Sequence, residues 1–197
     1  ELNVKVIGEG ANLGVTQAAR IAFAKSGGHI NTDAVDNSAG VDSSDHEVNI
    51  KILLKAAIEA GELEEASRNS LLASMTDEVA KKVLVHNYDQ TGALSVAEAS
   101  ASLDLDSHER MMERLEAAGI LNRLVEGLPK PEEIRTLHET KQGLTRPEIA
   151  VLLAYAKITL FDELVDSAVP SDPFLNDLYQ SYFPEPLRKF DKAMDTH

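Results

Sequence analysis

The chain has 197 residues, of which 43% are hydrophobic and 26% are charged, the composition of a globular protein able to bury a core. Its net charge of −14 argues against a nucleic-acid partner, because binding a phosphate backbone requires clustered Lys and Arg. The absence of cysteine excludes disulfides, thiolate zinc ligands and a cysteine nucleophile. The six histidines fall singly, with no pair at i,i+3 or i,i+4, and this spacing predicts no transition-metal site.

The sequence also predicts neither membrane insertion nor export. No apolar run approaches the roughly 20 residues needed to span a bilayer. The first residues lack the basic start and the long apolar stretch of a signal peptide. We therefore expect a cytoplasmic protein with no membrane partner. Because the first residue is Glu rather than Met, we expect the chain to be a piece of a longer polypeptide.

The N-terminal part is predicted to form a βαβ unit. Residues 2–7 are rich in β-branched side chains and are bounded by Gly8, which predicts a buried strand. Thr16 is placed to cap a helix with an apolar face, and two glycines end that helix. Residues 29–35 then read as a second short strand, which should lie parallel to the first. The open edges of such a small sheet should pair with another chain, pack onto the helices or leave residues 1–40 partly disordered.

The remainder is predicted to be helical, so the fold class is mainly α with a small βαβ piece at its start. The capping sequence Thr145-Arg-Pro-Glu148 is the strongest helix start in the chain, because it combines a capping box with a proline in the first turn. Asp106 and Glu109 are expected to cap another helix in the same way. The helix that this pair would cap spans residues 107–118, and further helices are predicted over residues 47–60, 131–139 and 171–184.

Two polar loops carry the functional signal, because each places Asn, Gly and a hydroxyl residue (Thr in the first, Ser in the second) where a strand should end. The first, GEGANLGVTQAA (8–19), has the form GxGxxxG, which would suit a pyrophosphate at a helix N-terminus, with Asp33 or Asp36 near the ribose. A plain glycine turn explains the same pattern at least as well. Asn12 offers donors and an acceptor to an amide or carboxylate ligand, although it could equally satisfy its own turn.

The second loop, VDNSAGVDSSDHE (35–47), is composed of short side chains, so a ligand could lie close to its backbone. Ser44 stands just before the predicted helix. It could serve only as the N-cap of that helix, or it could also offer its hydroxyl to a carboxylate near the positive end of the helix dipole.

Taken together, the two loops resemble the end of the cofactor domain of glutamate dehydrogenases. The matching positions are EGAN (9–12) with Thr16, followed by Asp33, Asn37, Gly40, Val41, Ser44 and Glu47. Residues 143–160 and 171–190 resemble the helical C-terminal region of the very large bacterial NAD-specific glutamate dehydrogenases. The resemblance therefore covers nearly the whole chain. It implies that residues 1–60 are the C-terminal part of a Rossmann-like NAD-binding domain and that residues 61–197 are a helical C-terminal domain.

The resemblance also implies roles for individual residues. Asn12 and Asn37 would bind the nicotinamide ribose or amide of NAD, while Asn12, Val41 and Ser44 would line the glutamate pocket. Ser44 would donate a hydrogen bond to the side-chain carboxylate of the substrate. Thr16 and Asp33 would be structural. The pyrophosphate turn of this family lies earlier in the cofactor domain. The resemblance therefore implies that the GxGxxxG pattern arises by coincidence and does not bind a pyrophosphate.

This chain departs from the family pattern beside the pocket. Ser38 and Ala39 replace the usual Ala and Gly, and Asp45-His46 replaces an aromatic pair. The wall of the substrate pocket is thus expected to differ from that of other family members, more than the positions of Asn12 and Asn37 do.

The catalytic groups of oxidative deamination are expected to lie outside this chain. The reaction needs a lysine of lowered pKa and a carboxylate, and in the family both come from an earlier domain. No lysine here has the Gly-rich surroundings of that lysine. The chain alone should therefore bind NAD weakly or not at all and be inactive. Its partners would be the rest of the same polypeptide, a second copy in a homo-oligomer and, in the parent enzyme, L-glutamate or 2-oxoglutarate.

The alternative is that this chain is not catalytic in any sense. Residues 62–197 could form an acidic helical module for interaction or assembly.

Overall fold

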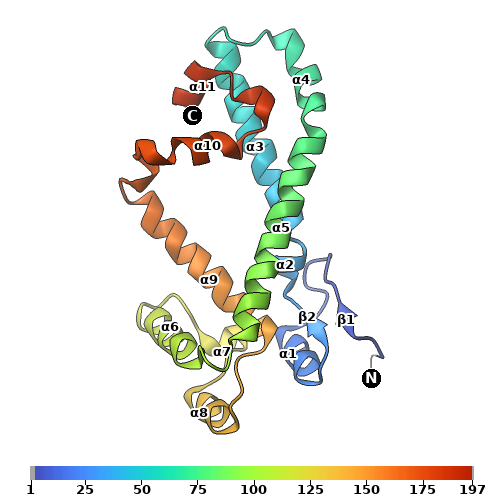
Figure 1. The fold of residues 1–197 in the computed structure, drawn as a ribbon, viewed down its shortest axis with the longest axis vertical. Helices are drawn as coiled ribbons and strands as arrows, with labels where there is room; N and C mark the ends of the chain where they lie inside the picture. Colours follow the sequence, from blue (N-terminus) through green and yellow to red (C-terminus); the bar gives the residue numbers. More distant parts are fainter. Residues whose placement is uncertain (1–2, 197) are drawn as a thin grey trace. The chain divides into compact units, whose positions relative to one another are not determined.

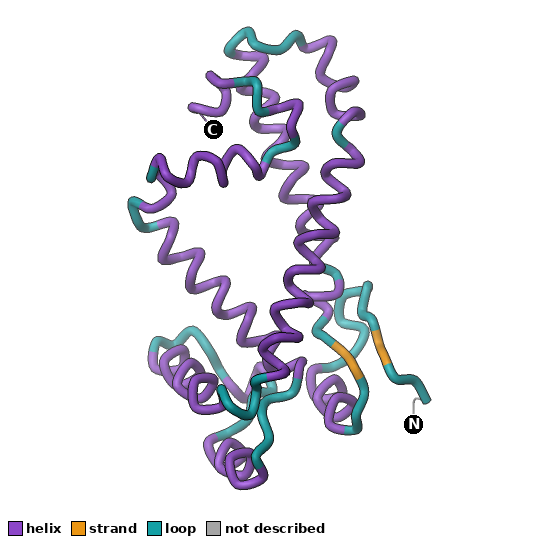
Figure 2. The backbone as a smooth tube through the Cα atoms, viewed as in Figure 1, coloured by secondary structure: helices purple, strands orange, loops and turns teal. Residues whose placement is uncertain are grey.

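The computed structural model describes residues 3–196, and it is built mainly from helices (Figure 1, Figure 2). Among these residues, the only strands are β1 (Val6–Ile7) and β2 (His29–Ile30). This confirms the predicted fold class. The helices are α1 (Gln17–Lys25), α2 (Asp33–Asp36), α3 (Ser38–Glu59), α4 (Arg68–Ser74), α5 (Thr76–Ala99), α6 (Leu105–Ala117), α7 (Arg123–Glu126), α8 (Pro131–Thr140), α9 (Arg146–Val165), α10 (Asn176–Tyr182) and α11 (Asp191–Thr196).

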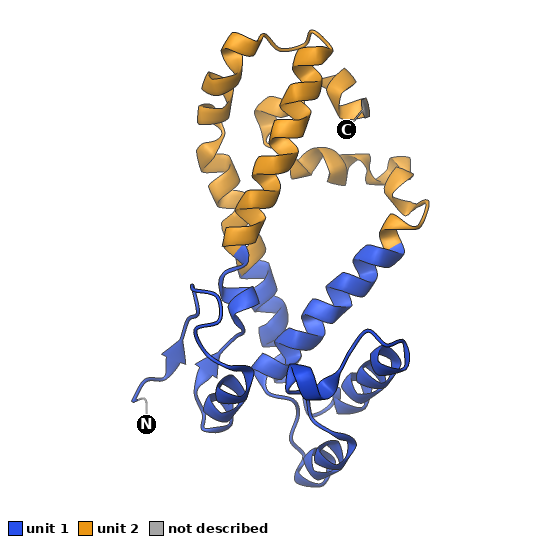
Figure 3. Cartoon of the chain, turned by 180° about the vertical axis from the view of Figure 1, so that it is seen from behind, with its two compact units in different colours: residues 1–38, 88–163 blue, residues 39–87, 164–197 orange. Residues whose placement is uncertain are grey.

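The chain forms two compact units (Figure 3). Unit 1 comprises residues 1–38 and 88–163, and unit 2 comprises residues 39–87 and 164–197. Each unit contains its own hydrophobic core. These units are spatial groupings of segments that lie far apart in the sequence, so they do not test the predicted division of the chain after residue 60.

In each core, apolar side chains of several helices are almost fully buried. The core of unit 1 includes Leu94, Leu105, Met112, Ile134 and Ile149. The core of unit 2 includes Leu53, Leu54, Met75, Phe183 and Leu187. Burial of this kind removes apolar surface from water and is the main driving force for folding.

The predicted βαβ unit is present but its strands are shorter than expected. β1 and β2 are parallel, with Val6 opposite His29 and Ile7 opposite Ile30. The second strand was predicted to reach residue 35, which is wrong. It ends at Ile30 because the backbone turns into α2, where the carboxylate of Asp33 accepts hydrogen bonds from the amides of Leu13 and Ala34. Of the first predicted strand, residue 2 lies outside the described residues.

α1 begins where the sequence indicates, because the hydroxyl of Thr16 accepts a hydrogen bond from the amide of Ala19 at 3.3 Å. Its predicted apolar face, however, is not buried. Ala18 and Ala19 are exposed, and the buried residue of this helix is Arg20. A sheet of two short strands is too narrow to cover a helix face, so the burial of α1 is decided by the polar partners of Arg20.

α3 starts at Ser38, nine residues before the predicted position 47. The reason is that the buried stripe of this helix extends toward its N-terminus through His46, which lies one turn before Ile50 on the same face. The small and polar residues at the start of α3 have a composition typical of a loop. They are helical because the residues that follow them in the same helix are buried. Ser44 consequently lies inside α3 and is not its N-cap, which corrects the predicted capping role.

The later helices follow local signals more closely. Thr145 donates its backbone N–H to the carboxylate of Glu148 at 2.7 Å, which confirms the helix start predicted there. α8 spans Pro131–Thr140, close to the predicted range. α6 instead begins at Leu105, with Asp104 at the N-cap position and no side-chain cap, so the predicted Asp106–Glu109 capping pair is wrong. The last predicted helix is divided, since a 3₁₀ turn capped by Asp172 precedes α10.

No helix within residues 3–196 is both long enough and apolar enough to cross a membrane.

Two glycine substitutions test this packing. Gly143→Ala should lower the free energy of unfolding by about 1–3 kcal/mol, because the added Cβ would lie 2.4 Å from the carbonyl carbon of Ala101. Gly92→Ala, in the interior of α5 with open space around the new Cβ, should raise it by about 0.5–1 kcal/mol. Urea unfolding followed by circular dichroism measures both. Equal effects of the two substitutions would contradict the packing of residue 143 against residue 101.

Candidate ligand-binding loops

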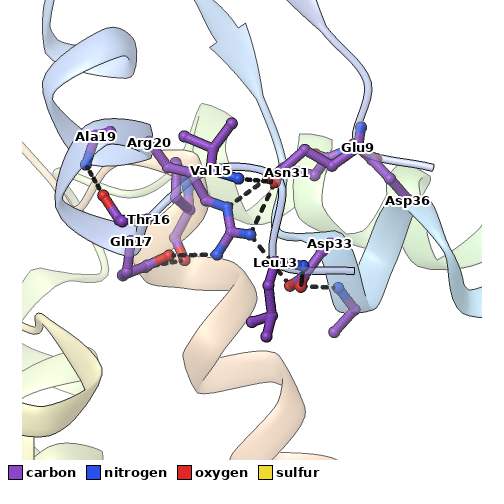
Figure 4. Close-up of polar contacts among 12 residues, drawn as sticks. Glu9, Leu13, Val15, Thr16, Gln17, Ala19, Arg20, Asn31, Asp33 and Asp36 are labelled. Carbon is purple, nitrogen blue, oxygen red and sulfur yellow. Dashed lines mark hydrogen bonds and ion pairs between the residues drawn. The ribbon is translucent and has the colours of Figure 1, made fainter. Parts of the chain in front are cut away.

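The first polar loop is held by a buried ion pair between Arg20 and Glu9 (Figure 4). The Nε of Arg20 lies 2.5 Å from Oε2 of Glu9, and its Nη2 lies 3.0 Å from Oε1, so the contact is bidentate. The side chains are only 7% and 3% exposed. Arg20 also contacts Asp33, whose Oδ1 lies 3.2 Å from Nη2. The proximity of Glu9 raises the pKa of Arg20, mainly through this hydrogen bond.

Carboxylates also bind the backbone amides of the same loop. Asp36 accepts the amide of Glu9 at 2.8 Å, and Asp33 accepts the amide of Leu13 at 2.8 Å. Glu9 itself accepts the amide of Val15 at 2.8 Å. Loop amides need such partners when they are not in regular structure. The result is that a glycine-rich segment is fixed at three points, although Leu13 has a positive φ of 59°.

This arrangement argues against the pyrophosphate interpretation of GxGxxxG. The amides of Glu9, Leu13 and Val15 already donate to carboxylates. A pyrophosphate would have to displace these carboxylates and would lie among negative charges, which is unfavourable. The glycines therefore act as part of a turn that is held by acidic side chains.

A second set of contacts connects the loop to helices of the same unit. Asn31 donates to Asp36 at 2.6 Å and accepts a hydrogen bond from Nε of Arg146 at 2.5 Å. Arg146 also forms an ion pair with Glu98 at 3.0 Å. The start of α9 thereby fixes the segment that follows β2, and this segment leads into α2.

These contacts bring the two predicted asparagines together. The Nδ2 of Asn37 donates to Oδ1 of Asn12 at 2.9 Å, across 25 residues of sequence. Asn12 is exposed and Asn37 is half-buried. In this orientation the pair leaves the Nδ2 donors of Asn12 and the Oδ1 acceptor of Asn37 for a ligand. A neighbouring donor and acceptor match the two sides of a carboxamide group.

The other two predicted residues, Val41 and Ser44, lie in the first two turns of α3 and belong to unit 2. Both are exposed, and Val41 is 73% exposed. The contacts of unit 1 thus join Asn12 to Asn37, whereas Val41 and Ser44 are not part of that network. The hydroxyl of Ser43, their neighbour, donates to the carbonyl of Ala39 at 2.6 Å.

Sequence reasoning missed the central role of Arg20 and Glu9. From the sequence, Glu9 was identified only as part of the EGAN motif, and Arg20 was not singled out. The sequence did contain a signal for this pair. Arg20 stands among small apolar residues of a predicted helix, and an arginine that is buried in such a position needs an acidic partner. Asp33 was expected to be structural, and the structure confirms that role.

Comparison with known proteins identifies the class of this chain. Residues 1–97 match the family model described as bacterial NAD-glutamate dehydrogenase, catalytic domain, and residues 141–197 match glutamate dehydrogenase, C-terminal. The chain thus combines a segment similar to the catalytic domain of this class of protein with a segment similar to its C-terminal domain.

Individual relatives agree. The NAD-specific glutamate dehydrogenase of Pseudomonas aeruginosa is 49% identical over 198 residues, covering 100% of this chain and 12% of the relative. Those of Halomonas elongata and Mycobacterium tuberculosis are each 46% identical, covering 95% and 96% of this chain and 12% of each relative. The chain belongs to the bacterial NAD-specific glutamate dehydrogenase family, and it spans about one eighth of the length of these relatives.

Glu9→Gln should lower the free energy of unfolding by about 3 kcal/mol, because it leaves the buried guanidinium of Arg20 without its main counter-charge. Glu59→Gln is the matched control, since it removes a carboxylate from an exposed pair with Lys55 and should change stability little. Urea unfolding of both variants decides the point. A Glu9→Gln protein as stable as the control would show that the ion pair does not hold the loop.

The stability contribution of Asp33 should depend on pH. The amide of Leu13, followed by the charge of Arg20, lowers the pKa of Asp33 below its ordinary value of 3.8. The contribution is therefore fully present from about pH 5 upward, above the unfolded-state pKa of 3.8, and is lost progressively as the pH falls through the lower folded-state pKa. The difference in unfolding free energy between the wild type and Asp33→Asn should shrink between pH 5 and pH 3. A difference that stays constant over that range would contradict this assignment.

Proposed function

We propose that this chain forms one wall of the cleft in which an NAD-dependent glutamate dehydrogenase oxidises L-glutamate to 2-oxoglutarate and ammonia. The Asn12–Asn37 pair is the observation that carries the proposal, because a fixed loop presents a donor and an acceptor side by side. The relatives, which are named as NAD-specific glutamate dehydrogenases, support the reaction and the cofactor.

Each site residue has a chemical task in this proposal. Asn12 and Asn37 bind the amide or ribose at the nicotinamide end of NAD, and Asn12 also contacts glutamate. Val41 offers exposed apolar surface to the methylene groups of the substrate. Ser44 donates its hydroxyl to the side-chain carboxylate of glutamate. Because Ser44 lies within the second turn of α3, the helix dipole adds less there than it would at an N-cap.

When bound, NAD accepts the hydride that leaves the α-carbon of glutamate. The residues of this chain would orient the nicotinamide and the substrate for that transfer, since positioning of reactants accounts for a large part of enzymatic rate enhancement. The lysine and the carboxylate that move protons would come from another part of the polypeptide. The chain alone would therefore be inactive and would bind NAD weakly or not at all.

The same proposal covers the setting of the chain. Residues 1–60 complete the dehydrogenase domain, and residues 61–197 form the helical C-terminal domain of a cytoplasmic homo-oligomeric enzyme. L-Glutamate and 2-oxoglutarate are its small-molecule partners.

A second candidate function is an acidic helical interaction or assembly module. The observation that favours it is the exposed apolar surface on the second half of α9, where Ile158 is 51%, Leu160 is 54% and Phe161 is 65% exposed. Exposed apolar residues in succession are typical of a surface that contacts protein. The two functions are compatible if the helical region assembles the enzyme to which the loops belong.

In the full-length protein that carries this chain, Ser44→Ala should raise KM for L-glutamate by at least about tenfold, because a hydrogen bond to a charged group is worth about 1.5–3 kcal/mol. Asn12→Ala should raise KM for NAD as well as for glutamate. The rate is followed as NADH absorbance at 340 nm, and the isolated 197-residue chain serves as the inactive reference.

Ser43→Ala is the matched control, since its hydroxyl is bonded to the helix backbone and it should leave the kinetics unchanged. Wild-type kinetics in both Ser44→Ala and Asn12→Ala would overturn the proposal and leave the interaction module as the main account. Turnover by the isolated chain would overturn the assignment of the catalytic groups to other segments.

A further inference from the structure

Three potential metal ligands from two helices meet in unit 2. Asp42 and His46 lie one turn apart on α3, and His86 comes from α5. One donor atom of each residue lies within 4.8 Å of those of the other two. The Nδ1 of His86 is 2.8 Å from Oδ2 of Asp42, and the Nε2 of His46 is 3.7 Å from Oδ1 of Asp42.

His46 is the most unusual member of this group. Its side chain is fully buried, and neither ring nitrogen has a hydrogen-bond partner among the described residues. A buried polar group without a partner destabilises the folded state, so a buried imidazole in this position indicates a ligand that would bind its nitrogen. The ring is held in place by stacking on Tyr182 at a centroid distance of 4.6 Å and on His86 at 5.8 Å.

We propose that Asp42, His46 and His86 bind a Zn²⁺ ion. Two imidazoles and a carboxylate are ordinary zinc ligands, and water would complete a tetrahedral site. The ion would give the Nε2 of His46 the partner that it lacks and would use the carboxylate of Asp42, whose two oxygens each lie near a nitrogen of one of the two rings. His86 is 47% exposed, so its ring can turn to direct Nδ1 toward the ion.

The ligand chemistry favours zinc over magnesium or calcium, because those hard cations take mostly oxygen ligands whereas imidazole suits zinc. A structural role follows from the position of the site. Asp42 and His46 share one face of α3, whereas Ser44 lies on another, so an ion here would join α3 to α5 without using the proposed substrate residue. The nearby carboxylate of Asp45 is already occupied by the hydroxyl of Tyr182 at 2.6 Å.

The histidine spacing in the sequence predicted no such site. His46 and His86 are separated by 39 residues along the chain, and only the packing of α3 against α5 within unit 2 brings their rings together. A second group, formed by Asp106, Glu109 and His138, resembles it in composition. That group lies at the surface and includes no buried ligand without a partner, so it carries no proposal and serves as a control.

The test measures Zn²⁺ binding to the 197-residue chain by isothermal titration calorimetry. The absence of cysteine removes thiolate competition for the metal. We expect one tight Zn²⁺ per chain in the wild type. His86→Ala should weaken binding at least about tenfold, since even the loss of an outer partner of a metal ligand costs 10–100-fold in affinity. His138→Ala should bind as the wild type does.

Because His46 is fully buried, the test relies on the more exposed ligands, His86→Ala and Asp42→Asn, and adds a thermal readout. Zn²⁺ should raise the Tm of the wild type and of His138→Ala but not of His86→Ala, and Mg²⁺ should raise none of them. Wild-type affinity in His86→Ala and Asp42→Asn, or an equal loss in His138→Ala, would overturn the proposal. A Tm that does not respond to Zn²⁺ would do the same.

Discussion

The buried ion pair between Arg20 and Glu9 is the interaction on which the candidate site depends. Removing two charges from water is costly, and the cost is offset only when the pair is bidentate and its remaining atoms are hydrogen-bonded. Both conditions are met here, through the two contacts between the side chains and through the amide of Val15. The pair thereby holds a glycine-rich segment, which would otherwise adopt many conformations, in a single loop conformation.

The position of Asn12 follows from that loop. Without the carboxylates of Glu9 and Asp33, nothing in the local sequence would fix a segment that contains three glycines and a left-handed leucine. With them, Asn12 is held within hydrogen-bond distance of Asn37, which directly follows α2. Preorganisation of this kind matters for a binding site, because side chains that are already in place lose less entropy when a ligand binds.

Sequence reasoning predicted those features that depend on neighbouring residues. The cap at Thr16, the helix start after Thr145, where Glu148 accepts the amide of Thr145, and the helix that begins at Pro131 are all present. It failed where distant contacts decide the structure. α2 replaces the end of a predicted strand because the Asp33 carboxylate is bound 20 residues back along the chain, at Leu13. α3 extends through a loop-like sequence because His46 continues its buried face.

The candidate site likewise has some features that the sequence predicts and others that depend on distant contacts. The motifs pointed to Asn12 and Asn37, and the structure brings them together, but the supporting network of Arg20, Glu9 and Asp36 depends on contacts between residues 11 to 27 positions apart. No periodicity reveals such contacts. Likewise, His46 and His86 lie on different helices, so the spacing of histidines within a single helix could not predict that their rings meet.

The central claim is that the Asn12–Asn37 pair contacts the nicotinamide end of NAD. It is tested most directly by an experimental structure of the full-length protein with NAD and 2-oxoglutarate bound. We expect the Nδ2 of Asn12 or the Oδ1 of Asn37 to lie within about 3.2 Å of a polar atom of the nicotinamide carboxamide or its ribose. A nicotinamide bound elsewhere, with both amides facing only solvent or protein, would contradict it.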